Sequence, residues 1–381
     1  MKIALVRGDF AAPGEFPNFI PLTKKHDVIL FTGLIPVWKL KENSGLKIKR
    51  LPSPVDLNLG KISKILMAIL NRLFKDAHVL FGLEEELKGF DIAHTAETYY
   101  SYTQQCIKAK EKGYVLKVVS TVWENIPHNN EGIRGRKEFK LNSFKNVDLF
   151  LPVTNTARKV LIEEGCPKEK IIVMKPGIDV DFFKPQKITS FANIKKDRNI
   201  KIIFVGRLIA DKGILEILDI FQKMQKKYPK IELIISGQGD LEEEIGKKIE
   251  NEKLENVRLL GKVSYDDMPK VYNLCDIFVH YPIGSKTWSE QYGMVLIEAM
   301  ACGLPIVALD RGSIKEVVGQ SGLVSNEKNF PKNLEMLIEN RKFREGLSKK
   351  ARRNAITFYD ATKYARKLEK IYNGLLAGSY S

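Results

Sequence analysis

The sequence has 381 residues, which is long for a single hydrophobic core and predicts two domains. Its apolar runs are only four or five residues long, whereas a bilayer span needs roughly 20, and its start shows no signal-peptide pattern, so we expect a cytoplasmic protein. The net charge of +16 is divided about equally between the two halves, which fits a Lys-rich surface or attraction to phosphates and anionic lipid heads.

Short apolar runs alternate with amphipathic stretches along the whole chain. In the first half the runs predict strands at residues 3–6, 28–32, 48–52, 92–95, 117–122, 149–154 and 171–175. In the second half they predict strands at residues 201–206, 232–236, 257–260, 277–280, 306–309 and 322–324. Helical periodicity fills most of the gaps, as at residues 213–228. This alternation is typical of an α/β protein with parallel sheets covered on both faces.

The two sets of strands are separated near residues 178–200, where the sequence is polar and has no sustained periodicity. We therefore expect two doubly wound domains, at 1–180 and 181–358, with ligands in a cleft at the carboxyl ends of the strands. Residues 343–376 read as helical with a break near Tyr359-Asp360. The last part, 359–381, is expected to return as a helix to the N-terminal domain.

The four cysteines are Cys106, Cys166, Cys275 and Cys302, and they show no paired spacing. This pattern argues against a disulfide framework or a zinc site and fits a reducing compartment.

Residues 289–310, SEQYGMVLIEAMACGLPIVALD, carry the most informative motif. Gly293 permits close approach of the backbone to a ligand, and a helix follows at 294–301. The start of that helix offers N–H groups and a positive dipole end to a phosphate. Glu298 lies about one turn inside, where a carboxylate accepts ribose hydroxyls, and Glu290 lies just before the helix, toward the cleft.

Two further segments support a phosphate site. In 204–214, FVGRLIADKGI, a strand ends and Arg207 and Lys212 precede a helix, so two cations suited to a diphosphate lie above the strand ends. In ISGQGDLEEE, Gly237 and Gly239 allow a loop to pass close to a ligand. The spacing is not GxGxxG, and no such fingerprint follows the first strand, which argues against a nicotinamide or flavin oxidoreductase.

These motifs together resemble the retaining glycosyltransferases of family 4, whose GT-B fold has two Rossmann-like domains. VGRLIADKG, SGQGDLEEE, EQYGMVLIEAMACGLPIVA and VTNTARKVLIEEGCPKEKIIVMKPGIDVDFF carry the resemblance, which covers more than half of the chain. It implies that Arg207 and Lys212 hold the donor diphosphate, that Glu298 holds the ribose, and that Glu290 contacts the donor sugar near its anomeric carbon. Donor contacts are also expected from Gly293, Met294, Val295, Gly237 and the backbone of Val263. The family needs no metal and no cofactor, and its donors are nucleotide sugars such as UDP- or GDP-sugars.

The N-terminal half departs from that family. Where many members have a Gly-Gly loop, this chain has RGDFAAPGEFPNF, in which Gly14 is the candidate for close approach to the phosphate. Where many carry a histidine after the fifth strand, this chain has Trp123. Glu124 and His128 are therefore the candidates for contacts on the acceptor side.

The stretch 61–77, KISKILMAILNRLFKDA, places six aliphatic residues at helical spacing beside four basic ones. It is either a helix packed on the core or an interfacial helix on a membrane that carries a lipid-linked acceptor. A second basic stretch lies at 134–141.

We therefore expect a glycosyltransferase that moves a hexose-type sugar from a nucleoside diphosphate to a glycan or lipid-linked glycan, in the synthesis of cell-surface polysaccharide or glycoconjugates. The alternatives are a GT-B epimerase or phosphorylase, whose acid–base groups or pyridoxal lysine motif are not recognised, and a basic nucleic-acid-binding protein, for which no motif appears. We expect no nucleic-acid partner.

Overall fold

The computed structural model describes residues 1–40, 45–57 and 75–379. The chain forms two compact units, Met1–Gly177 with Ala361–Ser381, and Ile178–Asp360. The sequence boundaries at 180 and 358 differ from these by three and two residues. The first unit is thus built from two separate stretches of chain, and the second is one continuous stretch.

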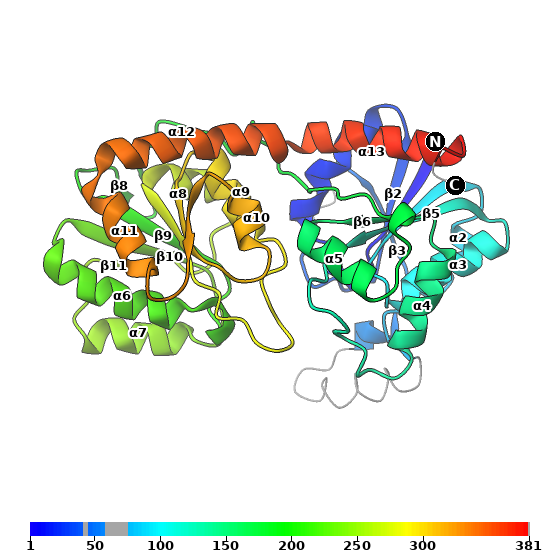
Figure 1. Cartoon of the computed structure of the whole chain (residues 1–381), viewed down its shortest axis with the longest axis horizontal. Coiled ribbons are helices and arrows are strands. Elements are labelled where there is room, and N and C mark those ends of the chain that lie inside the picture. The colour runs from blue at the N-terminus through cyan, green and yellow to red at the C-terminus, as the bar shows by residue number, and fades with distance from the viewer. Residues whose placement is uncertain (41–44, 58–74, 380–381) are drawn as a thin grey trace. The chain divides into compact units, whose positions relative to one another are not determined.

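The N-terminal unit is built on a parallel sheet of six strands in the order β3-β2-β1-β4-β5-β6 (Figure 1). The strands are β1 Lys2–Val6, β2 Asp27–Thr32, β3 Lys47–Arg50, β4 Phe90–Ala96, β5 Val115–Val122 and β6 Leu149–Pro152. The α-helices described in this unit are α2 Leu83–Glu86, α3 Ser101–Glu111, α4 Arg136–Asn146, α5 Asn155–Glu163 and α13 Ala361–Leu376. Apolar side chains of α2, α3 and α4 fill the core on one face of the sheet.

The other face of this sheet is covered by short 3-10 turns and by the C-terminal helix. Prolines at 13, 17 and 21 interrupt the chain after β1, and 3-10 turns η1 Gly8–Phe10, η2 Pro13–Asn18 and η3 Ile20–Lys24 replace an α-helix there. Further 3-10 turns are η4 Pro54–Leu57 and η6 Lys168–Lys170. The helix α13 packs beside η2 and η3, and Tyr372 Oη lies 2.5 Å from buried His94 Nδ1. The expected return of the C-terminal helix to this domain is confirmed.

The C-terminal unit has a second parallel sheet of six strands, in the order β11-β10-β9-β12-β13-β14. The strands are β9 Ile200–Val205, β10 Ile231–Ser236, β11 Val257–Leu259, β12 Ile277–His280, β13 Ile306–Leu309 and β14 Gly322–Ser325. They alternate with α6 Ile214–Lys227, α7 Glu242–Asn251, α8 Met268–Leu274, α9 Met294–Ala301 and α10 Ile314–Val318, and α11 Phe330–Glu339 and α12 Arg341–Phe358 follow. Ile217, Leu218 and Phe221 of α6 show how periodic apolar residues become one buried face.

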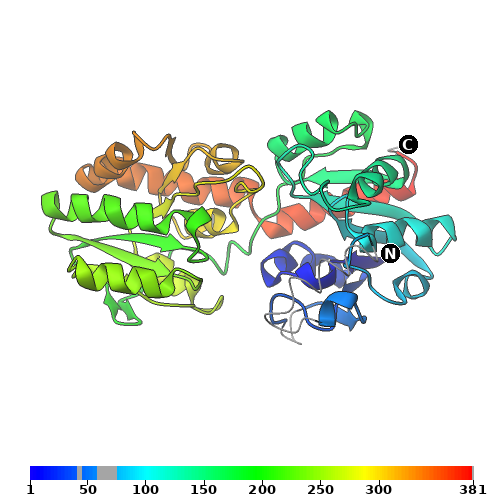
Figure 2. The same cartoon turned by 90° about the horizontal axis from the view of Figure 1, so that it is seen from below.

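The two sheets have the same topology. Each begins with a central strand, β1 or β9, adds two strands on one side, and then returns to add three on the other. Reversing the direction places later helices on the opposite face, so that α6 and α7 cover one face of the C-terminal sheet while α9 and α10 cover the other (Figures 1 and 2). A crevice at the carboxyl ends of the two central strands is the usual ligand site of such sheets. That point lies between β1 and β4 in the first unit and between β9 and β12 in the second.

The expected fold, two Rossmann-like domains of the GT-B type, is confirmed, with three local differences. Residues 171–175 make only a single bridge, from Ile171 to Phe150. The segment 178–200, which the sequence predicts to be irregular, contains a small hairpin, β7 Ser190–Phe191 and β8 Ile194–Lys195, whose Ile194 is fully buried. Residues 61–74 of the amphipathic stretch lie outside the described residues, and Lys75, Asp76 and Ala77 are not helical.

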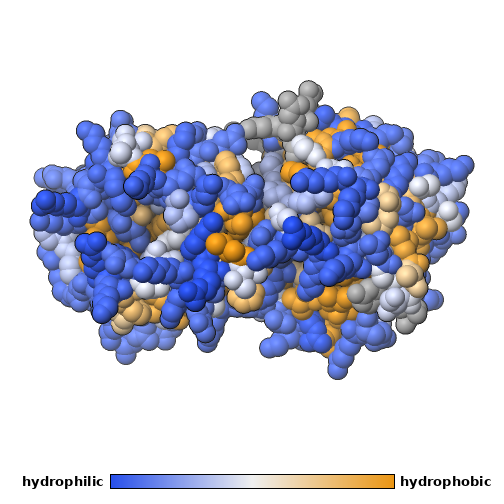
Figure 3. Space-filling view, turned by 90° about the horizontal axis from the view of Figure 1, so that it is seen from above, coloured by the Kyte–Doolittle hydropathy of each residue, from blue (hydrophilic) through white to orange (hydrophobic). Residues whose placement is uncertain are grey.

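Within the described ranges, no helix has both the length and the apolar character that crossing a bilayer requires. The helix α12 has a strongly basic exposed side, which consists of Arg341, Lys342, Lys349, Lys350 and Arg353. Seen from above, the surface along this helix is largely hydrophilic (Figure 3).

Candidate donor site

The site predicted in the C-terminal unit lies where β9 and β12 end. After β9 the chain makes a 3-10 turn, η7 Ala210–Lys212, and then enters α6, so Lys212 stands directly above the strand ends. After β12 a longer loop carries Glu290 and leads into α9. Because β9 and β12 are neighbours in the sheet, the two loops meet.

Lys212 and Glu290, both predicted site residues, are in direct contact. Lys212 Nζ lies 2.6 Å from Glu290 Oε2. His280, the last residue of β12, places its Nε2 3.0 Å from the same oxygen. Glu290 is 9% exposed and His280 is 2% exposed, so the three groups form a largely buried cation–carboxylate–imidazole cluster.

The electrostatics of this cluster fix the charge of Glu290. Burial alone raises the pKa of a carboxyl, but the hydrogen bond and charge of His280 and the ammonium of Lys212 outweigh that effect. The pKa of Glu290 falls from 4.5 to about 2. Glu290 is therefore an ionised hydrogen-bond acceptor throughout the neutral range.

The other predicted cation has a different environment. Arg207 follows β9 and is exposed, so its guanidinium is accessible to an anionic ligand. Lys212, in contrast, also lies 4.5 Å from the centre of the Trp288 ring, which adds a cation–π contact to its ion pair.

Glu298 lies within α9, where it is buried and accepts a hydrogen bond from a residue of another helix. Tyr272 of α8 places its hydroxyl 2.9 Å from Glu298 Oε2. Burial raises the pKa of Glu298 from 4.5 to about 7, and the hydrogen bond from Tyr272 offsets part of that rise. Around neutral pH this carboxyl exists in both protonation states, and its ionised form is the one that accepts hydroxyl donors.

The start of α9 has the features expected of a phosphate-binding helix terminus. Gly293 caps it in the left-handed region, with φ of 78°, and no side chain caps the first turn. Met294 and Val295, the first two helical residues, are half-buried. The first N–H groups of a helix have no partner within it, so this terminus offers backbone donors to an anion.

Two glycines of this edge are required by close backbone packing. A Cβ on Gly237 would lie 1.8 Å from the carbonyl oxygen of Gly206, and a Cβ on Gly213 would lie 2.0 Å from that of Tyr281. Both glycines also have positive φ. Val263 lies half-buried in the loop after β11. Any side chain at 213 or 237 would push these loops apart.

The residues predicted in the N-terminal unit have different environments. Gly14 lies in η2, and a Cβ there would meet nothing within 4 Å, so no close approach within the chain requires glycine. Glu124 is buried, and its two oxygens accept bonds from the backbone of Asn125 and Ile126 and from the side chains of Asn129 and Asn130. These four bonds use the acceptor capacity of the carboxylate, so Glu124 organises its own loop.

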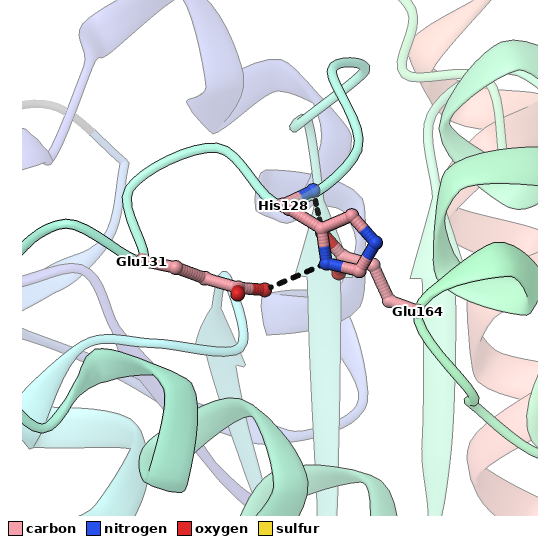
Figure 4. Close-up of side chains that lie close together, drawn as sticks. All are labelled: His128, Glu131 and Glu164. Carbon is pink, nitrogen blue, oxygen red and sulfur yellow. Dashed lines mark hydrogen bonds and ion pairs between the residues drawn. The ribbon is translucent and has the colours of Figure 1, made fainter.

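His128 lies at the surface in a small acidic cluster. Its Nδ1 is 3.1 Å from Glu131 Oε1, and its backbone N–H donates to Glu164 Oε1 at 2.7 Å (Figure 4). Among the described residues this is the only group of three or more potential ligands whose atoms lie close enough for a metal ion. Lys140 is only 2% exposed and lies 2.6 Å from Glu164 Oε1 and 3.3 Å from Glu131 Oε1. Its ammonium therefore already supplies a positive charge to both carboxylates.

Three residues of the site were not anticipated from the sequence. His280 carried a usable signal, because it is the polar residue that ends an apolar strand. Trp288 also carried a signal, because it lies only two residues before Glu290, directly before the most informative motif. Tyr272 had none, because an aromatic residue in a helix is normally part of the core.

Known proteins resemble this chain in sequence and in fold. Residues 185–354 match the glycosyl transferases group 1 family. The uncharacterized glycosyltransferase MJ1069 of Methanocaldococcus jannaschii is 24% identical over 95% of this chain and 93% of its own length. The phosphatidylinositol N-acetylglucosaminyltransferase GPI3 subunit of Saccharomyces cerevisiae is 30% identical, over 50% of this chain and 41% of its own.

Among solved structures, HepE from Anabaena in complex with UDP superposes with a TM-score of 0.76 and 18% identity, over 98% of this chain and all of HepE. HepE has also been solved with UDP-glucose. This likeness shows the GT-B fold. The group 1 domain at 185–354 and the relatives in sequence show that this chain is a glycosyltransferase-type enzyme.

Proposed function

We propose that the enzyme transfers a sugar from a nucleoside diphosphate sugar to a hydroxyl group of a glycan or lipid-linked glycan, with retention at the anomeric carbon, in the synthesis of cell-surface polysaccharide or glycoconjugates. The observation that carries the proposal is the contact of both Lys212 and His280 with Glu290 at the carboxyl edge of the C-terminal sheet. Cations and an ionised carboxylate beside a helix start suit a donor with a diphosphate on one side and a sugar on the other.

The bond to the leaving diphosphate breaks as negative charge develops on its oxygens. Lys212, Arg207 and the first N–H groups of α9 are the groups of this unit that can stabilise that charge. When the diphosphate binds, we expect Lys212 to exchange part of its contact with Glu290 for a phosphate oxygen. The positive charges of Lys212 and Arg207 and the N–H groups of α9 then stabilise the leaving diphosphate, and the proposal requires no metal or cofactor.

The ionised carboxylate of Glu290 accepts hydrogen bonds from donor sugar hydroxyls and faces the positive charge that develops at the anomeric carbon. His280 lies on the same oxygen and fixes its position. Glu298, in its ionised form, receives the ribose hydroxyls. Nucleotide binding to HepE supports a uridine donor, which we place first among the candidate bases.

We further propose that the enzyme works in the cytoplasm at a membrane surface. The net charge of +16 favours approach to anionic lipid. The yeast relative is named for transfer to phosphatidylinositol, a lipid acceptor, which supports the same reading.

The test is a thermal-shift screen of the purified chain against UDP, GDP, ADP, TDP and their sugars, followed by product analysis. A ligand that binds only the folded state increases the free energy of unfolding by RT ln(1 + [L]/Kd) and so raises the melting temperature. We expect one nucleoside diphosphate to raise it and its sugar to be consumed. If none does so, or if random oligonucleotides bind more tightly than every nucleotide, the proposal is wrong.

A further inference from the structure

Two buried carboxylates occupy the switch point of the N-terminal sheet, the position that corresponds to the donor site of the other unit. Asp9 follows β1 and Glu97 follows β4, and these strands are neighbours. Each residue is only 5% exposed. Neither residue has a role in the proposed function.

Both carboxylates have oxygens without a hydrogen-bond partner among the described residues. This holds for Oδ1 and Oδ2 of Asp9 and for Oε2 of Glu97. The other oxygen of Glu97 accepts the backbone N–H of Trp123 at 2.9 Å. Buried polar atoms are nearly always paired, so three unpaired carboxylate oxygens at one sheet edge call for an outside donor.

The backbone around these residues is adapted to hold them. Glu97 has φ of +59°, a left-handed conformation that is rare and strained outside glycine and concentrates at functional sites. A Cβ on Gly33 would lie 2.0 Å from Asp9 Oδ1, so only glycine leaves room for the carboxylate there. Burial raises the pKa of Asp9 to about 6, although His78 lowers it, and burial together with Glu124 raises that of Glu97 to about 8.

The chemistry of the surroundings limits the ligand. Asp76 also lies at this edge, where it accepts bonds from Arg136 and from Ser101, and it lies 3.0 Å from His78 Nδ1. At neutral pH the ionised carboxylate of Asp9, with a pKa of about 6, repels a phosphate or another anion, whereas Glu97, with a pKa of about 8, is mostly protonated. No three of their oxygens lie close enough for a metal ion, within the part of the chain that the structure describes. A neutral ligand with several hydroxyl donors satisfies both conditions.

Aromatic rings at the same edge favour a sugar. The rings of Phe10 and His78 are 5.0 Å apart, those of His78 and Tyr100 are 5.0 Å apart, and Tyr99 packs 4.8 Å from Tyr100. Phe10, His78 and Tyr100 are partly exposed. Ring faces pack against the apolar C–H face of a sugar, while carboxylates accept its hydroxyls.

An exposed apolar patch adjoins this polar edge. We call it the apolar patch, and it consists of Leu34, Ile35, Val37, Trp38 and Phe81, which are 47%, 67%, 64%, 46% and 49% exposed. Two hydrogen bonds tie it to the polar edge: Val37 N donates to the backbone oxygen of Asp9 at 2.9 Å, and Ile35 N to Asp56 Oδ1 at 2.9 Å. The backbone N–H of Phe81 donates to the carbonyl oxygen of Pro52 at 2.8 Å, just before the turn η4 that contains Asp56.

We infer that this edge binds an amphiphilic acceptor, a sugar carried on an apolar chain. Asp9 and Glu97 accept hydroxyls of the acceptor sugar, and the apolar patch contacts the chain. The inference rests on the proposed function and deepens it: it moves the acceptor contacts from Glu124 and His128 to Asp9 and Glu97 and specifies the acceptor class. Exposed aliphatic side chains beside an exposed tryptophan suit the boundary between lipid heads and acyl chains.

The experiment compares methyl and octyl glycosides of glucose, galactose, mannose and N-acetylglucosamine as acceptors, below the micelle concentration of the octyl compounds. The donor is the nucleotide sugar that stabilises the wild-type chain. We expect the KM of the octyl glycoside of the accepted sugar to be at least tenfold below that of its methyl counterpart. Asp9→Asn and Glu97→Gln should raise the acceptor KM at least tenfold for both forms, with donor affinity unchanged.

The apolar patch is tested separately by Val37→Ser combined with Trp38→Ser. This variant should bring the octyl-to-methyl KM ratio to near one. Glu138→Gln and Leu141→Ser, at exposed positions of α4 in the same unit, are matched controls and should behave as wild type. Asp9→Asn removes no hydrogen bond, so its melting temperature should not fall.

The outcomes separate the two proposals. If no nucleotide sugar binds the wild-type chain, the proposed function fails. If donor binds and sugar is transferred, but Asp9→Asn and Glu97→Gln keep the wild-type acceptor KM, the unpaired oxygens bind only water and the inference is wrong. Equal use of methyl and octyl glycosides by the wild type, or transfer to none of them, contradicts the amphiphilic acceptor.

Discussion

Lys212 Nζ and Glu290 Oε2 are 2.6 Å apart, although 78 residues separate them in the sequence. The pairing arises because β9 and β12, whose ends carry the two loops, are adjacent in the sheet. A cation that already neutralises a buried carboxylate is positioned without a ligand, so the proposed binding of a diphosphate would require little ordering of Lys212.

We predict that Arg207→Ala and Lys212→Ala each weaken binding of the donor diphosphate. Loss of a charge-assisted hydrogen bond costs about 1.5–3 kcal/mol, which is roughly a 10- to 150-fold rise in Kd. Calorimetric titration with the nucleoside diphosphate measures this. Lys223→Ala, an exposed lysine on α6, is the control and should leave Kd unchanged. Wild-type affinity in both site variants would remove them from the donor site.

Glu290→Gln should reduce stability in a pH-dependent way. The folded-state pKa of Glu290 is depressed, to about 2, so the ionised residue stabilises the fold above its unfolded value of 4.5, and this contribution is lost as pH falls toward 2. We expect the variant to be less stable than wild type by on the order of 2–3 kcal/mol between pH 5 and 8, with a smaller gap below pH 4.5. Urea unfolding at several pH values measures the gap, and a gap that grows on acidification would contradict the assignment.

Nucleotide affinity should rise with pH through the titration of Glu298. Its pKa is about 7, and ribose hydroxyls bind the ionised form, so a smaller fraction of the protein is competent at pH 6 than at pH 8. The apparent Kd scales inversely with that fraction, which gives roughly a tenfold improvement over this range. Glu298→Gln should bind more weakly and lose most of this dependence, while titration of the ligand phosphate remains in both proteins. Parallel pH profiles for the two would show that Glu298 does not contact the nucleotide.

Transfer should proceed without divalent metal. Two cations and a helix start are available to the diphosphate, and the His128 cluster already holds the ammonium of Lys140. We expect initial rates in EDTA to equal those in magnesium or manganese. The formation of product is measured by chromatography. Loss of activity in EDTA that either ion restores would overturn this prediction.

Gly237→Ala should destabilise the C-terminal unit. The residue has a positive φ, and a Cβ would lie 1.8 Å from the Gly206 carbonyl oxygen, so the loop must move. We expect a loss of at least about 1–3 kcal/mol, from strain and displaced packing. The matched control is Gly246→Ala within α7, where a Cβ meets nothing within 4 Å and alanine favours the helix. Equal effects of the two substitutions on urea unfolding would contradict the argument.

Much of the fold could be predicted because parallel strands buried on both faces leave a strong apolar signal. The strands at 277–280 and 306–309 and the helix at 294–301 have the bounds expected from the sequence. The hairpin at 190–195 was missed because it rests on one buried residue, Ile194, in a polar context. A single contact of that kind gives no periodicity.

The candidate donor residues were accessible because they stand at strand ends within recognisable motifs. In the N-terminal unit the pattern is weaker. Glu124 is a candidate because it lies beside Trp123, which replaces the histidine of the family, yet its carboxylate organises its own loop. Asp9 and Glu97 also follow strands but are not predicted from the sequence. Asp76 and His78 reach the same edge from a segment far along the chain, and only the fold brings them there.

The ends of the C-terminal unit are paired with each other. Ile178 N donates to Tyr359 O at 2.9 Å, and Ile178 and Asp360 form a bridge. A continuous unit whose first and last residues adjoin resembles a cassette inserted at one point of a host chain. On the proposed function, exchange of residues 178–360 as a block with the corresponding block of a relative should change the choice of nucleotide sugar and leave the choice of acceptor in place.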